Sequence, residues 1–236
     1  MPRSLADTIT PLARWFGEQS SGPWLRAELA CFSELLGHTV AGHAVQFELT
    51  SNTPEFLSVS PAVFHHRIQL EDDGRISGAC QGRADELPLM SNSVQLLVSH
   101  HSHEVGRQLD PRLSEWNRVL AANGTIVLVG FNALGRAFDA PFDGIQRLRP
   151  DQLSKRLRSF GLVPQRSRAV LLPGRRIDRA LERIQHAWPL TESWVAGLAL
   201  GYVMSARKID GGAMNLKLKN LQLKQVKRGV QGTAAG

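Results

Sequence analysis

The sequence predicts an α/β fold in which a mostly parallel sheet carries helices on both faces. Two apolar runs lead to this prediction, Ser93–Ser99 (SVQLLVS) and Thr125–Phe131 (TIVLVGF). Each run is apolar at odd and even positions alike, which is typical of strands buried on both faces of a parallel sheet. The segment between them has a helical pattern. A strand, a helix and a strand with short connections form a right-handed βαβ crossover.

The helix between these strands is expected to begin at Asp110, a candidate N-cap, with Pro111 at its first position. Leu113 and Trp116 recur at helical spacing and predict its buried face. Gly124 is expected to end the helix, because glycine readily adopts the left-handed conformation found after a last turn.

The N-terminal region has the pattern of two helices. Residues 4–19 carry apolar side chains at helical spacing, although Pro11 must kink or restart this helix. A second helix is expected to open at Pro23, with an inner face made of Trp24, Leu25, Leu29, Phe32 and Leu36. Core packing accounts for both helices, and a role in ligand binding is the alternative.

The first strands of the sheet are expected at His43–Thr50 and Phe64–Leu70. Only nine residues separate Leu70 from Cys80, fewer than the ten or more that a crossover helix needs. The sheet is therefore expected to be abbreviated in its first half, either by an antiparallel hairpin or by outright loss of a helix.

The second half of the chain continues the alternation of helix and strand. A helix is expected over Pro150–Phe160, closed by Gly161, and a strand over Val163–Leu172. Another helix is marked by apolar positions from Ile177 to Trp188, and the last strand is expected within Gly197–Lys208.

Composition indicates one domain in a reducing compartment. The chain has 236 residues, of which 42% are hydrophobic, enough for one sizeable core. Its two cysteines lie far apart, and its first residues show no apolar signal segment. No uncharged apolar run reaches the roughly 18 residues of a membrane-spanning helix. We therefore predict a cytoplasmic protein with N-terminal helices over residues 1–37, a main domain over 38–209 and a flexible tail over 210–236.

The positive charge of the chain is concentrated in that tail. From Arg207 onward there are seven basic residues and one acid, which accounts for +6 of the net charge of +7. A flexible basic tail can contact nucleic acid or an anionic surface without sequence specificity. A tail that only increases solubility is the alternative.

The central stretch resembles the second half of a class I SAM-dependent methyltransferase domain of type 11. The matching positions are Leu87-Pro88, Ser93-Val94, Glu115, Arg118-Val119-Leu120, Gly124 with the strand after it, and the helix end Leu157–Leu162. The closest resemblance is to a small bacterial subgroup of uncharacterised methyltransferase-like proteins with a GFNP-type motif, where this chain has Gly130-Phe131-Asn132-Ala133. The resemblance implies a Rossmann-like sheet with a seventh, antiparallel strand, S-adenosyl-L-methionine (SAM) as cofactor, and methyl transfer to an unidentified acceptor.

Three departures from the methyltransferase pattern concern the cofactor. The glycine-rich turn after the first strand is absent, since no glycine occurs between Gly42 and Gly74. Arg83 stands where the family has an acid that contacts adenine, and Gln95 stands in place of an aspartate. A glycine-rich turn lets the backbone approach a nucleotide closely, so its loss bears directly on cofactor binding.

Three acids are nevertheless candidates for binding the cofactor. Glu71 follows the second strand and lies 21 residues beyond Thr50, the spacing of a carboxylate that binds ribose hydroxyls. The alternative is that Glu71 only belongs to a turn between strands. Asp85 and Glu86 lie close to Arg83 and can substitute for the missing adenine contact.

The segment Ser99-His100-His101-Ser102-His103-Glu104 leaves the carboxyl end of the central strand, where open α/β sheets bind their ligands. A histidine there can take a proton from a methyl acceptor. His101 and Glu104 are the candidate catalytic residues, and they occupy positions that look similar in the resembling subgroup. Ser99 and His100 are candidates for binding the cofactor. A loop histidine in contact with solvent is the alternative. No metal site is predicted, because the sequence identifies no distant third ligand.

Two functions therefore remain open. One is an enzyme that transfers a methyl group from SAM, a reaction that depends on alignment more than on a catalytic dyad. The other is a methyltransferase-fold protein without cofactor that has a binding or regulatory role. The fold cannot choose between them, because one fold supports many functions.

Overall fold

The chain folds around one β-sheet, and the computed structural model describes residues 6–18, 21–36, 42–71, 73–106, 109–133, 145–171 and 199–209. In chain order the elements are α1 (Ala6–Gly17), α2 (Gly22–Leu36), β1 (His43–Glu48), η2 (Phe56–Val59), β2 (Phe64–Leu70), β3 (Arg75–Gly78), β4 (Gly82–Arg83), β5 (Val94–His100), α3 (Leu109–Val119), β6 (Leu120–Phe131), α4 (Pro150–Ser159), β7 (Leu162–Val170) and β8 (Gly201–Lys208). The predicted helix at 177–188 and the basic tail lie outside the described residues.

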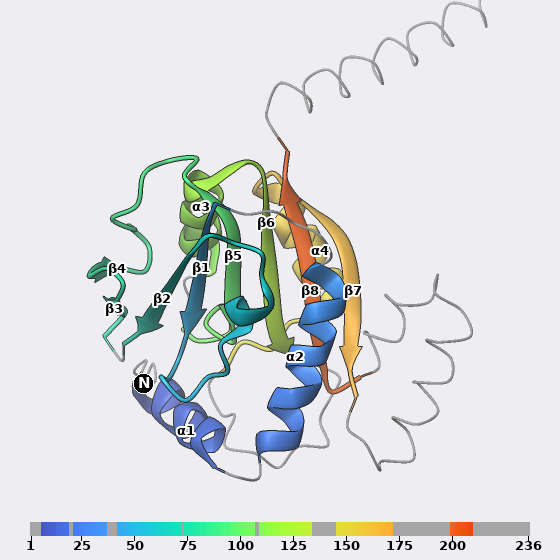
Figure 1. Cartoon of the computed structure of the whole chain (residues 1–236). Helices are drawn as coiled ribbons and strands as arrows, with labels where there is room; N and C mark the ends of the chain where they lie inside the picture. The colour runs from blue at the N-terminus through green and yellow to red at the C-terminus, as the bar shows by residue number, and fades with distance from the viewer. Residues whose placement is uncertain are drawn as a thin grey trace, which may run out of the picture.

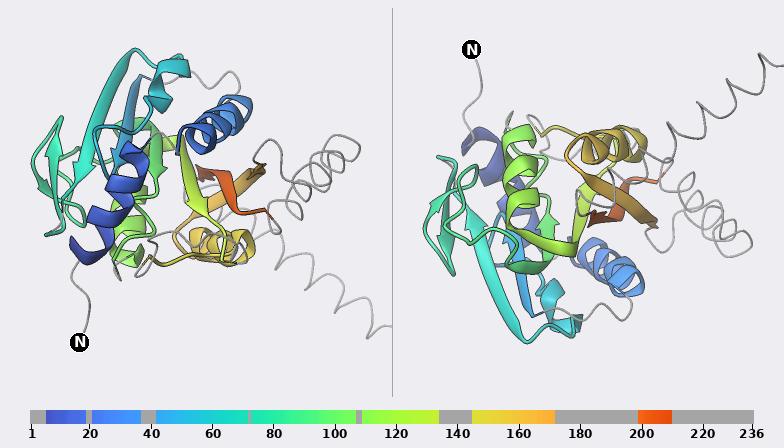
Figure 2. Two further views of the ribbon diagram at one scale, coloured as in Figure 1. Left: turned by 90° about the horizontal axis from the view of Figure 1, so that it is seen from below. Right: turned by 90° about the horizontal axis from the view of Figure 1, so that it is seen from above.

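The sheet has the order β4-β3-β2-β1-β5-β6-β8-β7 (Figure 1). The four central strands β2, β1, β5 and β6 are parallel, and β8 is antiparallel to both β6 and β7. Helix α2 covers one face and α3 and α4 cover the other (Figure 2), so the central strands are buried on both faces. The predicted α/β fold with a closing antiparallel strand is confirmed.

The first half of the sheet is shortened, as expected. Strands β3 and β4 form an antiparallel hairpin beside β2, in the place where a longer α/β sheet would continue through a crossover helix. The connection from β1 to β2 contains only the single 3-10 turn η2, whose Phe56 and Leu57 are fully buried. Of the two alternatives left open by the sequence, the hairpin is the one observed.

Helix α3 corrects one prediction. It ends at Val119, five residues before Gly124, and Asp110 lies inside its first turn instead of capping it. The chain enters β6 at once, because Leu120 already pairs with Val94, and the sheet register then shifts before Thr125 pairs with Leu96. Gly124 serves this irregular segment: a Cβ atom there would lie 2.9 Å from the carbonyl oxygen of Ala121.

Helix α1 lies at the carboxyl-end edge of the sheet (Figure 1), whereas α2 covers a face (Figure 2). Helix α1 lies beside the carboxyl ends of β1 and β2 (Figure 1), and its Ile9, Leu12 and Phe16 are buried. Helix α2 buries Trp24 and Phe32 as predicted. Within the described residues, no helix combines the length and the apolar character needed to cross a membrane.

Candidate functional site

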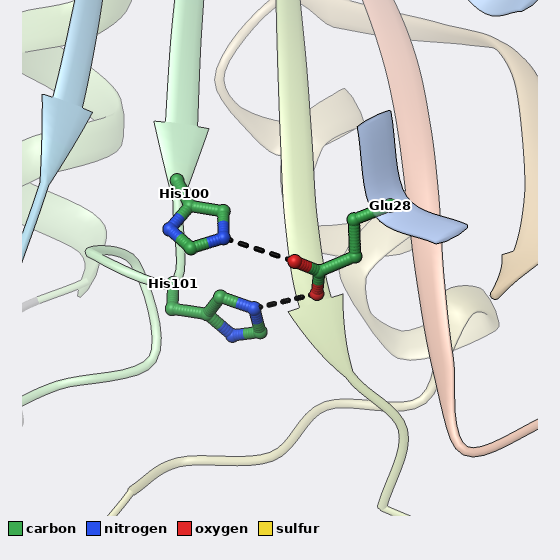
Figure 3. Close-up of side chains that lie close together, drawn as sticks. All are labelled: Glu28, His100 and His101. Carbon is green, nitrogen blue, oxygen red and sulfur yellow. Dashed lines mark hydrogen bonds and ion pairs between the residues drawn. The ribbon is translucent and has the colours of Figure 1, made fainter. Parts of the chain in front are cut away.

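A buried group of polar side chains gathers where β5 ends. Strand side chains normally alternate between the two faces of a sheet, so His100 and His101 should point in opposite directions. His101 instead has a positive φ of 53°, a left-handed conformation that is uncommon for a residue with a side chain. This turn brings both imidazole rings toward one carboxylate, that of Glu28 in α2 (Figure 3).

Glu28 is the centre of the group. Its Oε2 lies 3.0 Å from Nε2 of His100, and its Oε1 lies 2.8 Å from Nε2 of His101. The indole N–H of Trp24 also donates to Oε1, at 2.5 Å. All three residues that contact the carboxylate are at most 1% exposed, and Glu28 itself is 0% exposed. A buried carboxylate requires such partners, because burying an unpaired charge is very costly.

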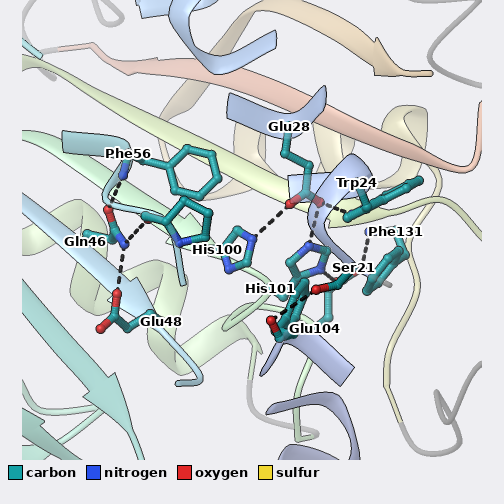
Figure 4. A network of polar contacts seen from close by, with 12 residues as sticks. Ser21, Trp24, Glu28, Gln46, Glu48, Phe56, His100, His101, Glu104 and Phe131 are labelled. Carbon is teal, nitrogen blue, oxygen red and sulfur yellow. Dashed lines mark hydrogen bonds and ion pairs between the residues drawn. The ribbon is translucent and has the colours of Figure 1, made fainter. Parts of the chain in front are cut away.

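Glu104 holds the other side of His101. Its Oε2 lies 2.5 Å from Nδ1 of His101, and its Oε1 accepts a hydrogen bond from the backbone N–H of Phe131 at 2.7 Å (Figure 4). Phe16 and Phe131 lie against the His101 ring, with centroids 5.0 and 4.2 Å away. The imidazole of His101 is therefore fixed between two carboxylates inside an aromatic shell.

The charges of this group follow from its contacts. Burial alone would lower the pKa of His101, but Glu28 and Glu104 raise it to about 9, so the ring is a cation at neutral pH. Burial alone would raise the pKa of Glu28, yet the charge of His101 and the hydrogen bonds from both histidines lower it to about 2. Burial and the neighbouring His101 lower the pKa of His100 to about 4, so this ring is neutral. Burial raises the pKa of Glu104.

Ser99 lies in a second, adjoining network. Its hydroxyl is 2.8 Å from that of Ser102 and 3.1 Å from Nδ1 of His103. Nε2 of His103 lies 3.3 Å from the hydroxyl of Tyr202 on β8. All four residues are at most 1% exposed. Burial lowers the pKa of His103 well below its ordinary value, so His103 is neutral.

The loop after β1 is held by side chains of the sheet. Arg67 of β2 donates to Glu48 at 2.9 Å and to the carbonyl oxygens of Ser51 and Thr53. Gln46 of β1 accepts the backbone N–H of Phe56 at 3.0 Å (Figure 4). The loop thus binds to its own sheet at the position where nucleotide-binding α/β folds have the glycine-rich turn.

Glu71 lies at the carboxyl end of β2, in the turn that leads to β3. Its carboxylate accepts a hydrogen bond from the Ser77 hydroxyl, and its backbone N–H donates to the carbonyl of Arg75 at 2.8 Å. Glu71 and Ser77 line an open depression of about 930 Å³, which also borders Asp73 and Arg83. Glu71 is therefore a turn residue, and its place beside the depression also leaves open the predicted role in binding a ligand.

Asp85 and Glu86 lie on the loop between β4 and β5. Asp85 is paired with Arg83 through two hydrogen bonds of 3.0 and 3.1 Å, and Glu86 is exposed. Among the predicted site residues, His100, His101 and Glu104 share one cluster, and Ser99 lies beside it. Glu71, Asp85 and Glu86 belong to the hairpin side of the sheet.

The Glu115 and Arg118 positions of the family pattern have a structural role. Glu115 accepts the backbone N–H of Leu87 at 2.7 Å, and Arg118 donates to the carbonyl of Leu87 at 3.0 Å. Arg118 also bonds Glu115, at 2.6 Å. Together the two side chains attach the Leu87-Pro88 loop to α3.

Glu28 is the site residue that the sequence analysis missed. It lies on the inner face of α2, one turn after Trp24 and one turn before Phe32. An acid within an apolar helical stripe is a signal, because a charge on a buried face needs a partner. The sequence could show that Glu28 needs a partner, but it could not identify the histidines 72 and 73 residues away.

No family model matches this chain, and no curated protein matches it. Solved structures do match. One chain of the complex between the Haloferax volcanii Trm112 methyltransferase activator and a methyltransferase aligns with a TM-score of 0.60 at 12% identity, covering 88% of this chain and 99% of that one. A SAM-dependent methyltransferase from Thermotoga maritima gives 0.54 at 13% identity, covering 86% and 98%. The [4+2]-cyclase SpnF gives 0.50 at 16% identity, covering 76% and 80%. At these identities the likeness concerns the fold: the chain has the Rossmann-like α/β fold of SAM-dependent methyltransferases.

Proposed function

We propose that this chain is a SAM-dependent methyltransferase that acts on an acceptor still to be identified. One observation carries the proposal: the carboxylate of Glu71 lies at the carboxyl end of β2 and lines an open depression. Open α/β sheets bind nucleotides at this edge, with an acid after the second strand on the ribose hydroxyls. The methyltransferase fold of the structural neighbours supports the same reading.

The residues of this edge fit the cofactor unequally. At the adenosine end, the Glu71 carboxylate can accept hydrogen bonds from both ribose hydroxyls. Asp85 and Glu86 lie on the loop that would face the adenine base. At the methionine end, the loop after β1 is bound by Arg67, and Phe56 fills the space beside β5. We therefore assign roles only at the adenosine end.

A bound SAM would supply a methyl group already activated by the sulfonium, so the protein has to bind, orient and exclude water. Ser99 and His100 end the central strand and would lie on the side that faces the reacting centre. His101 and Glu104 remain the predicted catalytic residues on the acceptor side. Both ring nitrogens of His101 lie on carboxylates, 2.5 Å from Glu104 and 2.8 Å from Glu28, so His101 can act as a base only after one nitrogen has lost its proton and turned from its carboxylate to the acceptor.

The second candidate is a methyltransferase-fold protein that binds no SAM and serves a binding or regulatory role. A specific observation favours it: Arg67 binds two carbonyl oxygens of the β1 loop and the buried carboxylate of Glu48. The backbone N–H groups of Asn52 and Thr53 are bonded to Thr50 within the same loop, and that of Phe56 is bonded to Gln46 of β1. One structural neighbour, SpnF, is a [4+2]-cyclase, so this fold is not restricted to one reaction.

Calorimetric titration of the folded full-length chain with SAM and with its demethylated product tests the proposal. Binding at micromolar concentrations is the expected result and would justify a search for the acceptor. Absence of heat with both compounds, on protein that shows a cooperative thermal transition, would overturn the proposal in favour of the second candidate.

A further inference from the structure

Three of the buried side chains at the end of β5 are arranged as ligands of one ion. Glu28, His100 and His101 each offer one ligand atom, and these atoms lie within 4.8 Å of one another. The carboxylate oxygens are 2.8 and 3.0 Å from the two Nε2 atoms. Two ligand atoms about 2.1 Å from an ion and at right angles to each other are about 3 Å apart. Each imidazole and the Glu28 oxygen that it faces therefore have the separation of adjacent ligands of an ion that Glu28 binds through both oxygens.

The backbone of His101 is bent in a way that serves this convergence. A regular strand would send the rings of His100 and His101 to opposite faces. The positive φ of His101 directs both to Glu28 instead. A left-handed conformation of a non-glycine residue costs free energy and is often found at functional sites.

The neighbours of the three side chains have the pattern of outer support for metal ligands. Metal-bound histidines usually donate their other ring N–H to a carboxylate, which fixes the ring and makes it a better ligand. Glu104 has this position at Nδ1 of His101, and is itself held by the N–H of Phe131. Trp24 orients the Glu28 carboxylate in the same way.

The charges also favour a cation. Two carboxyl groups, those of Glu28 and Glu104, are fully buried here on either side of the His101 ring. A divalent ion with neutral histidines would balance both carboxylates. An imidazole that binds an ion through Nε2 carries its proton at Nδ1. At His101 this nitrogen faces Glu104, and at His100 it is a buried atom that makes no hydrogen bond among the described residues.

We propose that Glu28, His100 and His101 form a binding site for one divalent first-row transition-metal ion, with Glu104 as the positioning residue for His101. Two imidazoles and one carboxylate suit Fe²⁺, Zn²⁺, Co²⁺ or Mn²⁺, and leave further coordination positions for water or substrate. The proposal does not depend on SAM, since an ion can bind here whether or not the chain is a methyltransferase.

The test uses the full-length chain produced in medium with added Co²⁺ or Zn²⁺ and dialysed without chelator. We expect one ion per chain by elemental mass spectrometry, and visible Co²⁺ absorption bands of a nitrogen–oxygen site. Because the cluster is fully buried, release to EDTA should take many times longer than release from a surface site. A wild-type chain that folds cooperatively but contains no ion under these conditions would overturn the proposal.

Variants locate the ion. Glu28→Gln and His100→Gln should lose it, and Glu104→Gln should weaken binding about 10- to 100-fold. The control is His66→Gln, because Nε2 of His66 lies 3.1 Å from Nδ1 of exposed His43 and this pair can bind metal adventitiously. Loss of the ion in His66→Gln, with retention in His100→Gln, would overturn the proposal. If the buried variants do not fold, slow EDTA release from wild type and unchanged metal content in His66→Gln still decide the question.

Discussion

Oε1 of Glu28 lies 2.8 Å from Nε2 of His101, although the two residues are 73 positions apart and belong to α2 and to the end of β5. Both side chains are fully buried, and they carry opposite charges at neutral pH. This contact joins α2 to the carboxyl end of β5, the edge at which open α/β sheets generally bind ligands.

Breaking this ion pair should destabilise the protein strongly. In the presence of a chelator, Glu28→Gln is expected to lower the free energy of unfolding by about 3–5 kcal/mol, because the buried His101 loses one of its two carboxylate partners. Urea unfolding measures the change. Glu34→Gln is the control, since Glu34 lies on the same helix with its side chain 58% exposed and should change stability little. A loss below about 1 kcal/mol for Glu28→Gln would contradict a buried ion pair.

The stability of the metal-free chain should fall on the alkaline side. The pKa of His101 is raised from 6.5 to about 9, so its contribution is complete below pH 6.5 and is lost as the pH rises through 9. His100 acts in the opposite direction, because its pKa is lowered from 6.5 to about 4 and stability is lost as the pH falls between these values. Together, the two histidines are expected to stabilise the folded chain most near pH 6.5.

Urea unfolding between pH 6 and 9.5 tests the predicted loss of stability at alkaline pH. Wild type is expected to lose stability more steeply than His101→Gln, which lacks the titrating ring. Parallel curves for the two proteins would show that His101 does not carry a raised pKa.

Removal of the Glu71 carboxylate should abolish most of the affinity for SAM without unfolding the chain. Each hydrogen bond to a charged group contributes about 1.5–3 kcal/mol, so loss of two should weaken binding by about a hundredfold or more. Calorimetry on Glu71→Ala and on Asp73→Ala provides a matched comparison, because both residues line the same depression. Equal affinities, or a lower melting temperature for unliganded Glu71→Ala alone, would make Glu71 a turn residue.

The attachment of the Leu87 loop to α3 should contribute measurably to stability. Glu115→Ala leaves the backbone N–H of the buried Leu87 without its acceptor, which is expected to cost about 1–3 kcal/mol. Glu115→Gln keeps an acceptor and should cost less. Chemical denaturation of both variants measures the cost, and Ser114→Ala on the exposed side of the same helix is the control. An equal loss of stability in all three variants would show that Glu115 does not stabilise the attachment.

Gly124 should tolerate no side chain. A Cβ atom there would lie 2.9 and 3.1 Å from the carbonyl oxygens of Ala121 and Val94, so Gly124→Ala is expected to cost about 1–3 kcal/mol. At Gly22 a Cβ would meet only the end of the Arg26 side chain, at 3.4 Å, and Gly22→Ala should be nearly neutral. Thermal unfolding distinguishes the two variants. Similar melting temperatures would show that the backbone around Gly124 has room for a side chain.

The sequence alone determined which segments form the central strands of the sheet. Strand β2 runs over the predicted residues Phe64–Leu70, and β5 differs from its predicted bounds by one residue at each end. The shortened first half also followed from the nine residues between Leu70 and Cys80. These features could be predicted because burial on one or both faces imposes a local periodicity, and because chain length limits which connections fit.

Tertiary structure alone decided the candidate site. The pattern around Gly124 predicted a helix end five residues too late, because pairing of Leu120 with Val94 overrides local propensity. The metal hypothesis lacked a third ligand in the sequence, and the structure supplies Glu28 from another helix. His101 was identified as a site residue, but its two carboxylate partners and its cationic state depend on packing. A periodic pattern reports only whether a side chain is buried, whereas its partner and its pKa are set by contacts between segments far apart in the chain.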